Sequence, residues 1–249
     1  MRTGERSVAG LPLPLLAGFV LAFIAQLLMH QFSVTQASRE YRPLSKPFDA
    51  PVYAGLSLGS HRLMSYLLSI RLQLHDNQAG RHVRYDRINY HLLIEWLDQI
   101  SQLNRHSEYP MMLASRIYSQ TQDKSRLRNL LEFIDDQFTA RPQLHWRRQA
   151  EATVIAKHQL GDLELALEMA KKLAGQPDSI QMPHWARDMQ FLLLGDLNEF
   201  ETAMLIIQAL LQSGSITDPD ELRFLKIKLL YFQQKLSELK QKSIKIPVN

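Results

Sequence analysis

Hydrophobic and polar positions divide the chain into three stretches of different pattern. From Leu11 to Met29 nearly every residue is apolar, and Gln26 is the only strongly polar side chain. Residues 33–51 are polar and contain three prolines, and after Tyr53 apolar residues recur at helical spacing almost to the end of the chain. No stretch alternates with a period of two for long enough to form a convincing strand. The pattern therefore predicts an all-α protein.

The apolar stretch has the length of a transmembrane helix. At about 1.5 Å per residue, such a helix spans roughly 28 Å, close to the hydrocarbon thickness of a bilayer. A cleaved signal peptide is the alternative, but its apolar region is usually only about 7–15 residues long. The sequence predicts a tail over residues 1–10, a transmembrane helix over 11–30 that contacts the lipid bilayer through residues 11–29, and an extended linker over 31–52.

Four polar residues open apolar-periodic segments in the helical part of the chain: Asp86, Asp123, Asp162 and Asn198. Asp and Asn are favoured N-cap residues because their side chains accept hydrogen bonds from the free N–H groups of a first helical turn. The separations of 37, 39 and 36 residues suit a repeated pair of helices.

The clearest repeat runs from Ala150 to Pro177. Gly161-Asp162 supplies its turn, and Ala166 and Ala170 are small enough for the two helices to approach closely. These features resemble the tetratricopeptide-like superfamily, over roughly residues 85–239. The resemblance implies an α-solenoid of helix pairs, which we assign to residues 53–240.

The C-terminal part of the chain begins with a strong helix start, Asp218-Pro219-Asp220-Glu221. Acidic residues stabilise the positive end of a helix dipole, so we expect a helix from Pro219 to about Lys240. Its apolar residues fall on one side, as a terminal unit that caps a helical stack requires. We expect residues 241–249 to form a basic tail.

Three further segments resemble parts of bacterial single-span membrane-anchored proteins: Asp76–Gly80, Glu108–Gln120 and Ser215–Leu225. Near the apolar stretch, Arg6 is closer on the N-terminal side than Arg39 is on the C-terminal side. A short basic N-terminus commonly remains in the cytoplasm. We therefore predict a single-pass protein of the bacterial inner membrane whose body is periplasmic.

The composition excludes several kinds of functional site. The chain has no cysteine, which excludes disulfides, thiolate metal sites and cysteine nucleophiles. The net charge is +4, and the basic residues are scattered among the acidic ones, so we expect no nucleic-acid partner. No phosphate-binding glycine loop is present, and we predict no cofactor.

Two motifs point weakly to chemistry. Gly55–Gly59 matches the G-x-S-x-G nucleophile elbow, but that elbow requires a strand before the serine, and here a proline-rich segment precedes it. The nine histidines are single, and the closest mixed group is His75, Asp76 and His82, without metal-ligand spacing. We predict no catalytic residue and no metal site.

Segments that combine arginine with aromatic residues are the best candidates for partner binding, because Arg and Trp are enriched at binding hot spots. The alternative is that the tryptophans pack between repeats and the arginines pair with nearby acids. The candidates are Arg84, Arg87, Trp146, Arg147, Arg148 and Trp185.

These observations predict that the chain is not an enzyme but a membrane-anchored protein–protein interaction scaffold, or an accessory or assembly subunit of an envelope complex, with protein partners at or in the membrane. One alternative is a tethered helical domain that binds a small molecule or metal, or is enzymatic, with its site near His75, His82 and Arg84. A purely structural subunit of a multisubunit membrane complex is the other.

Overall fold

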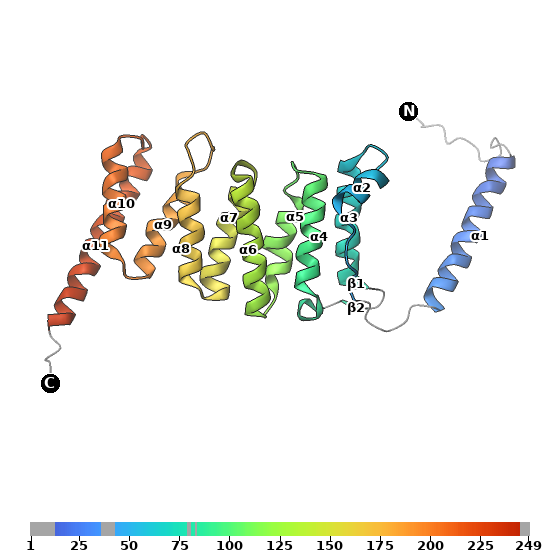
Figure 1. Ribbon diagram of the computed structural model, residues 1–249, viewed down its shortest axis with the longest axis horizontal. Coiled ribbons are helices and arrows are strands. Elements are labelled where there is room, and N and C mark those ends of the chain that lie inside the picture. The colour runs from blue at the N-terminus through green and yellow to red at the C-terminus, as the bar shows by residue number, and fades with distance from the viewer. Residues whose placement is uncertain (1–12, 36–42, 79–80, 83, 245–249) are drawn as a thin grey trace, which may run out of the picture. The chain divides into compact units, whose positions relative to one another are not determined.

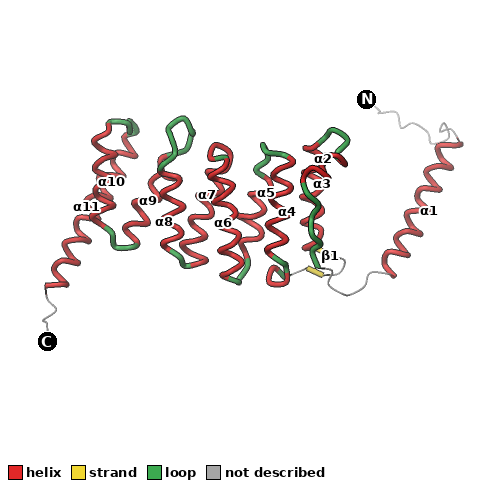
Figure 2. Tube along the Cα trace, in the orientation of Figure 1, coloured by secondary structure: helices red, strands yellow, loops and turns green. Residues whose placement is uncertain are grey.

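The computed structural model describes residues 13–35, 43–78, 81–82 and 84–244, and these residues are almost entirely helical (Figures 1 and 2). The chain divides into two compact units, one of residues 1–42 with 77–82 and one of residues 43–76 with 83–249. The only strands among the described residues are β1 (Asn77–Gln78) and β2 (Arg81–His82), which pair antiparallel. The predicted all-helical class is confirmed.

In the first unit, α1 (Leu13–Thr35) is apolar on all sides. Its segment Pro14–Gln31 has a mean hydropathy of 1.6 and none of it is buried in the structure, so the helix is long and apolar enough to cross a membrane. The helix passes the predicted end at residue 30. No proline or glycine follows until Pro43, so nothing local breaks the helix at that point. The predicted tail over residues 1–10 lies outside the described residues.

The predicted extended linker is only partly correct. Residues 36–42 lie outside the description, while residues 43–49 are extended and α2 (Ala50–Leu56) follows at once. Leu44 is buried, and the Ser45 carbonyl accepts a 2.8 Å hydrogen bond from Trp96 Nε1. This segment therefore belongs to the folded body, because Leu44 is buried and a tryptophan far along the chain donates a hydrogen bond to Ser45.

The second unit contains the remaining helices. In chain order they are α2, α3 (His61–Asp76), η2 (Tyr85–Arg87), α4 (Tyr90–Leu103), α5 (Tyr109–Met112), η3 (Leu113–Ile117), η4 (Tyr118–Gln120), α6 (Lys124–Ala140), α7 (Pro142–Ile155), η5 (Ala156–Leu160), α8 (Leu163–Ala174), α9 (His184–Asp196), α10 (Phe200–Ser213) and α11 (Pro219–Ile244). From α6 to α11 each helix packs chiefly against the helices next to it in sequence, while α2 packs against both α3 and α4. Figure 1 shows these helices as a row.

Two of the four predicted caps are confirmed. Asp123 accepts hydrogen bonds from the backbone N–H groups of Ser125 and Arg126 at the start of α6. Asp162 accepts one from Leu165 at 2.9 Å at the start of α8. The residue before it, Gly161, has a φ of +77°, a left-handed conformation that glycine adopts without a Cβ penalty.

The other two predicted caps are wrong. Asp86 lies within the short helix η2, and α4 is capped by Asn89, which accepts from the backbone N–H groups of His91 and Leu92. Asn198 has a φ of +63°, and α10 begins after it at Phe200. Asn and Asp are favoured in tight turns as well as at caps, so the residue type alone does not separate the two positions.

Helix α11 begins as predicted, because the Asp218 carboxylate accepts a 2.9 Å hydrogen bond from the backbone N–H of Asp220. It continues to Ile244, beyond the predicted end near residue 240, and residues 245–249 of the predicted tail lie outside the description. On its inner side Leu225 and Phe232 are buried.

Glycine at position 195 lets α9 and α11 approach closely. A Cβ at Gly195 would lie 2.5 and 2.7 Å from two ring carbons of Phe232, which is itself buried against Phe200. We expect Gly195→Ala to lower the free energy of unfolding by about 1–3 kcal/mol, as overpacking does. Urea unfolding should show this loss, together with partial recovery in the double variant Gly195→Ala/Phe232→Leu.

The matched control is Gly55→Ala, where a Cβ would meet nothing within 4 Å. This variant should unfold like the wild type or slightly later, because alanine favours helix. Equal stability of the variants at 195 and 55 would contradict close packing at this crossing.

Candidate functional site

An open groove of roughly 620 Å³ crosses three segments of the second unit. Its walls come from η3, from the length of α7 and from the start of α9. The lining residues are Ser115, Arg116, Trp146, Arg147, Arg148, Ala150, Glu151, Val154, Ile155 and Trp185. Four of the six predicted partner-binding residues therefore lie together, although they are as much as 39 positions apart in sequence.

The two tryptophans of the groove contact each other. The ring centroids of Trp146 and Trp185 are 6.0 Å apart and the rings meet edge to face, an arrangement that aromatic pairs favour. Trp146 is half-buried against the core residues Phe138, Ala150 and Leu173. Trp185 keeps 54% of its surface exposed. Trp146 therefore packs in the body, as the alternative interpretation of the sequence expected, whereas Trp185 presents an aromatic surface to solvent.

Two further exposed side chains extend this surface. Val154 is 48% exposed on α7, and Arg147 is exposed with its guanidinium carbon 5.2 Å from the centre of the Trp146 ring. Among the described residues Arg147 has no carboxylate within ion-pair distance. An arginine held over an aromatic ring keeps its charge available at the groove.

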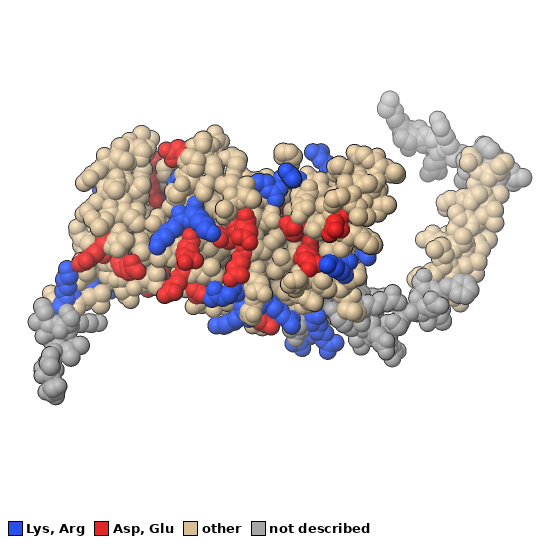
Figure 3. All heavy atoms as spheres, in the orientation of Figure 1, with Lys and Arg blue, Asp and Glu red and all other residues tan. Residues whose placement is uncertain are grey.

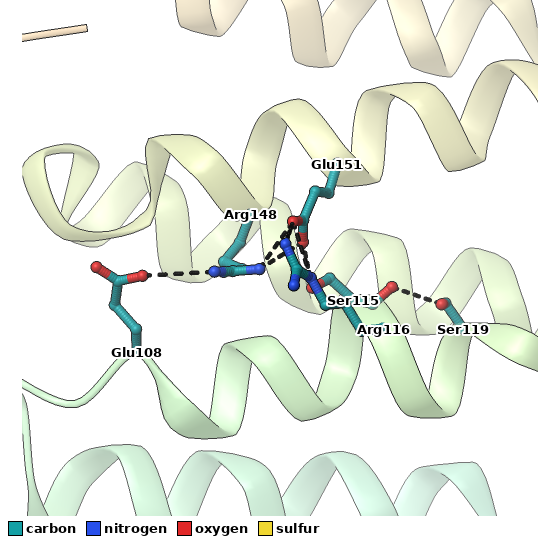
Figure 4. Close-up of polar contacts among 6 residues, drawn as sticks. All are labelled: Glu108, Ser115, Arg116, Ser119, Arg148 and Glu151. Carbon is teal, nitrogen blue, oxygen red and sulfur yellow. Dashed lines mark hydrogen bonds and ion pairs between the residues drawn. The ribbon is translucent and has the colours of Figure 1, made fainter.

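Glu151 is the centre of a polar network on the same wall (Figure 4). Its carboxylate accepts hydrogen bonds from Ser115 Oγ at 2.7 Å, from Arg116 Nε at 3.0 Å and from Arg148 Nη1 at 2.7 Å. Burial alone would raise the pKa of Glu151, but these donors outweigh it and lower the pKa below the ordinary value. The network joins α7 to η3.

Arg148 is a buried part of this network. Its side chain is only 11% exposed, and its second terminal nitrogen lies 3.7 Å from Glu108. The structure therefore places Arg148 where it holds helices together, in agreement with the alternative interpretation of the sequence. The groove lining still contains three arginines and one glutamate, which leaves it cationic.

The remaining two candidates lie elsewhere. Arg84 precedes η2 and Arg87 ends it; both are exposed, and neither lines the groove. The neighbouring Tyr85 packs edge to face on Tyr118. The six sequence-predicted residues therefore do not form one site.

Sequence reasoning missed Arg116, Glu151 and Val154. The hydrogen bonds between Arg116 and Glu151 join residues 35 positions apart on different helices, and nothing in the local pattern around either residue indicates that they meet. The combination of tryptophan with neighbouring arginines was the signal that pointed to this region.

The residues that the sequence offered for metal binding or catalysis have structural roles, as far as the structure describes them. Asp76 is buried and accepts a 2.9 Å hydrogen bond from the Tyr118 hydroxyl, while the His82 side chain lies outside the described part. Ser57 Oγ donates to the Ala54 carbonyl at the end of α2, where a nucleophile elbow would need a preceding strand. Within the described part, no three His, Asp or Glu residues come close enough to hold a metal.

Charged residues do not gather by sign on the face of the helical body that Figure 3 shows. Lys and Arg alternate with Asp and Glu there. Comparison of the chain with models of protein families, with curated proteins and with solved structures gives no match.

Proposed function

We propose that this protein is a membrane-anchored scaffold that holds a segment of a protein partner in the Trp146–Trp185 groove. The observation that carries the proposal is the exposed Trp185 beside Val154 and Arg147, because Trp and Arg are the residue types that dominate binding energy at interfaces. Such a scaffold would serve as an accessory or assembly subunit of an envelope complex.

The proposed architecture is an α-solenoid of the tetratricopeptide-like kind. Helices pack in chain order, and Ala166 and Ala170 are fully buried where α8 meets its neighbours. Two of its turns are capped by aspartates at 123 and 162. Stacked pairs of this kind bury a continuous core and leave an extended face for a partner.

The proposed anchor is α1. Its length of 23 residues corresponds to about 35 Å of helix, which exceeds the hydrocarbon core and allows some tilt. We place it in the bacterial inner membrane with the body in the periplasm. A reporter that fluoresces only in the cytoplasm, fused after Asn249, should stay dark; bright cells would overturn this orientation.

The groove is tested by crosslinking in cells followed by purification in mild detergent, with the co-purifying chains identified. Wild-type protein should recover a defined membrane partner. The double variant Trp185→Ala/Arg147→Glu should recover at least tenfold less, since loss of a hot spot costs about 2 kcal/mol or more of binding energy.

The matched control is Leu205→Ala, which removes a large side chain that is 66% exposed on α10 and does not line the groove. Both variants should keep the helical circular dichroism of the wild type. Equal recovery of the same partner by the groove variant and the wild type would refute the groove as the binding site.

A further inference from the structure

Helix α3 carries apolar residues on two faces. The inner face packs against α4, where Leu68 and Leu72 are buried and Ser65 donates a 3.3 Å hydrogen bond to the Ile100 carbonyl. The outer face consists of Leu63, Tyr66, Leu67 and Leu74, which are 54%, 57%, 50% and 63% exposed. Positions three, four and seven apart lie on one side of a helix, so these residues form one stripe.

The residues around α2 are exposed in the same way. Phe48, Val52 and Leu56 are 62%, 48% and 60% exposed. Leu58 is 96% exposed, and its φ of +48° lies in the left-handed region, which costs a leucine roughly 1–2 kcal/mol. Helices α2 and α3 pack together at one end of the row, a position where a soluble stack needs a polar face (Figure 1).

The charge of this surface is mostly positive. Residues 48–75 contain Arg62 and Arg71, and their only acidic residue is the exposed Asp49. Arg62 is one helical turn from Tyr66, and Arg71 is one turn from Leu67 and Leu74, so both arginines border the apolar stripe. An apolar face bordered by basic residues is typical of helices that lie in the interface of an anionic membrane.

We propose that the outer face of α3, together with the exposed apolar residues of α2, lies on the surface of an anionic lipid bilayer. The inference rests on the proposed anchoring by α1: only seven residues separate α1 from Pro43, so the tether keeps this surface at a high effective concentration near lipid. A second copy fits less well, since each face carries two arginines but only one carboxylate, Asp49, and two such faces would repel each other.

The absence of native cysteine permits a direct test in the full-length protein. Leu67→Cys is labelled with an environment-sensitive fluorophore, and the protein is reconstituted into vesicles of equal parts phosphatidylcholine and phosphatidylglycerol. Nitroxide groups on the lipid acyl chains should quench the label at 67 strongly. Leu21→Cys in α1 is the positive control, and Leu205→Cys, which is similarly exposed on α10, is the matched negative control.

Each outcome decides the proposal. Quenching at 67 well above that at 205, reduced in the Arg62→Glu/Arg71→Glu variant, supports it. Equal weak quenching at 67 and 205, in protein that floats with the vesicles and is quenched at 21, overturns it while leaving the anchor intact. Protein that neither floats nor is quenched at 21 overturns the anchor and this inference together. Excimer emission from a pyrene label at 67 would assign the face to a second copy instead.

Discussion

Replacement of Glu151 by alanine is expected to lower the free energy of unfolding by about 2–4 kcal/mol. The carboxylate neutralises Arg148, whose side chain is only 11% exposed, and it also accepts hydrogen bonds from Ser115 and Arg116. Without Glu151, Arg148 keeps only the longer contact to Glu108, at 3.7 Å, and the cost of a poorly compensated charge in a poorly solvated place dominates the loss. Because Glu151 itself is 27% exposed, the loss should fall below that of a fully buried pair.

Urea unfolding of Glu151→Ala measures this loss, and a double variant identifies its cause. Glu151→Leu/Arg148→Met removes both charges and should regain much of the stability, since apolar residues often replace a buried ion pair at little cost. Glu132→Ala, at an exposed position on α6, should change stability by less than about 0.5 kcal/mol. A double variant as unstable as Glu151→Ala would show that packing, and not the poorly compensated arginine, sets the loss.

Replacement of Asp188 by asparagine should have a large effect in the opposite direction. Asp188 on α9 is only 4% exposed and interacts with Glu221 on α11, and one oxygen of each carboxyl is buried without a hydrogen-bond partner among the described residues. Burial, followed by hydrogen bonding and charge repulsion from Glu221, raises the pKa of Asp188 from 3.8 to about 8. The folded protein therefore holds a proton at neutral pH that the unfolded chain has released.

The sign of the pH dependence follows from this proton. Between the unfolded pKa of about 4 and the folded pKa of about 8 the folded state binds more protons, so stability falls as pH rises through that window. Each pKa unit corresponds to about 1.4 kcal/mol. We expect Asp188→Asn to gain about 2–3 kcal/mol at pH 8, because an amide needs no proton to remain neutral.

Unfolding between about pH 6.5 and 8 isolates this effect from that of His145. Burial, together with Arg141 and Arg148, lowers the pKa of His145 to about 4, so the histidine costs stability only below its ordinary value of 6.5. The wild type should lose stability across the chosen window, and Asp188→Asn should lose much less. Asp136→Asn, at an exposed site, should follow the wild type. Equal slopes for the wild type and Asp188→Asn would contradict a protonated Asp188.

Asp188 and Glu221 show that the local sequence does not reveal which acidic residues meet in the folded protein. Asp188 and Glu221 are 33 positions apart, and each looks like an ordinary surface acid of a helix. The tertiary structure brings the two carboxyl groups together and buries Asp188. The same holds for the linker. Pro43 and Pro47 lie in its extended part, but Pro51 lies in the first turn of α2, and the attachment through Ser45 depends on Trp96, 51 residues further along the chain.

The sequence by itself determined the features that depend on residues close together in the chain. The helical class, the apolar helix near the N-terminus, the caps at Asp123 and Asp162 and the start of α11 depend on side-chain period and on hydrogen bonds within a single turn. The tertiary structure alone decided which tryptophan is exposed, that Arg148 is buried against Glu151, and that Arg84 and Arg87 lie outside the groove. Those outcomes depend on contacts between helices some 35–40 residues apart, where packing and desolvation set the energy and the local pattern carries no signal.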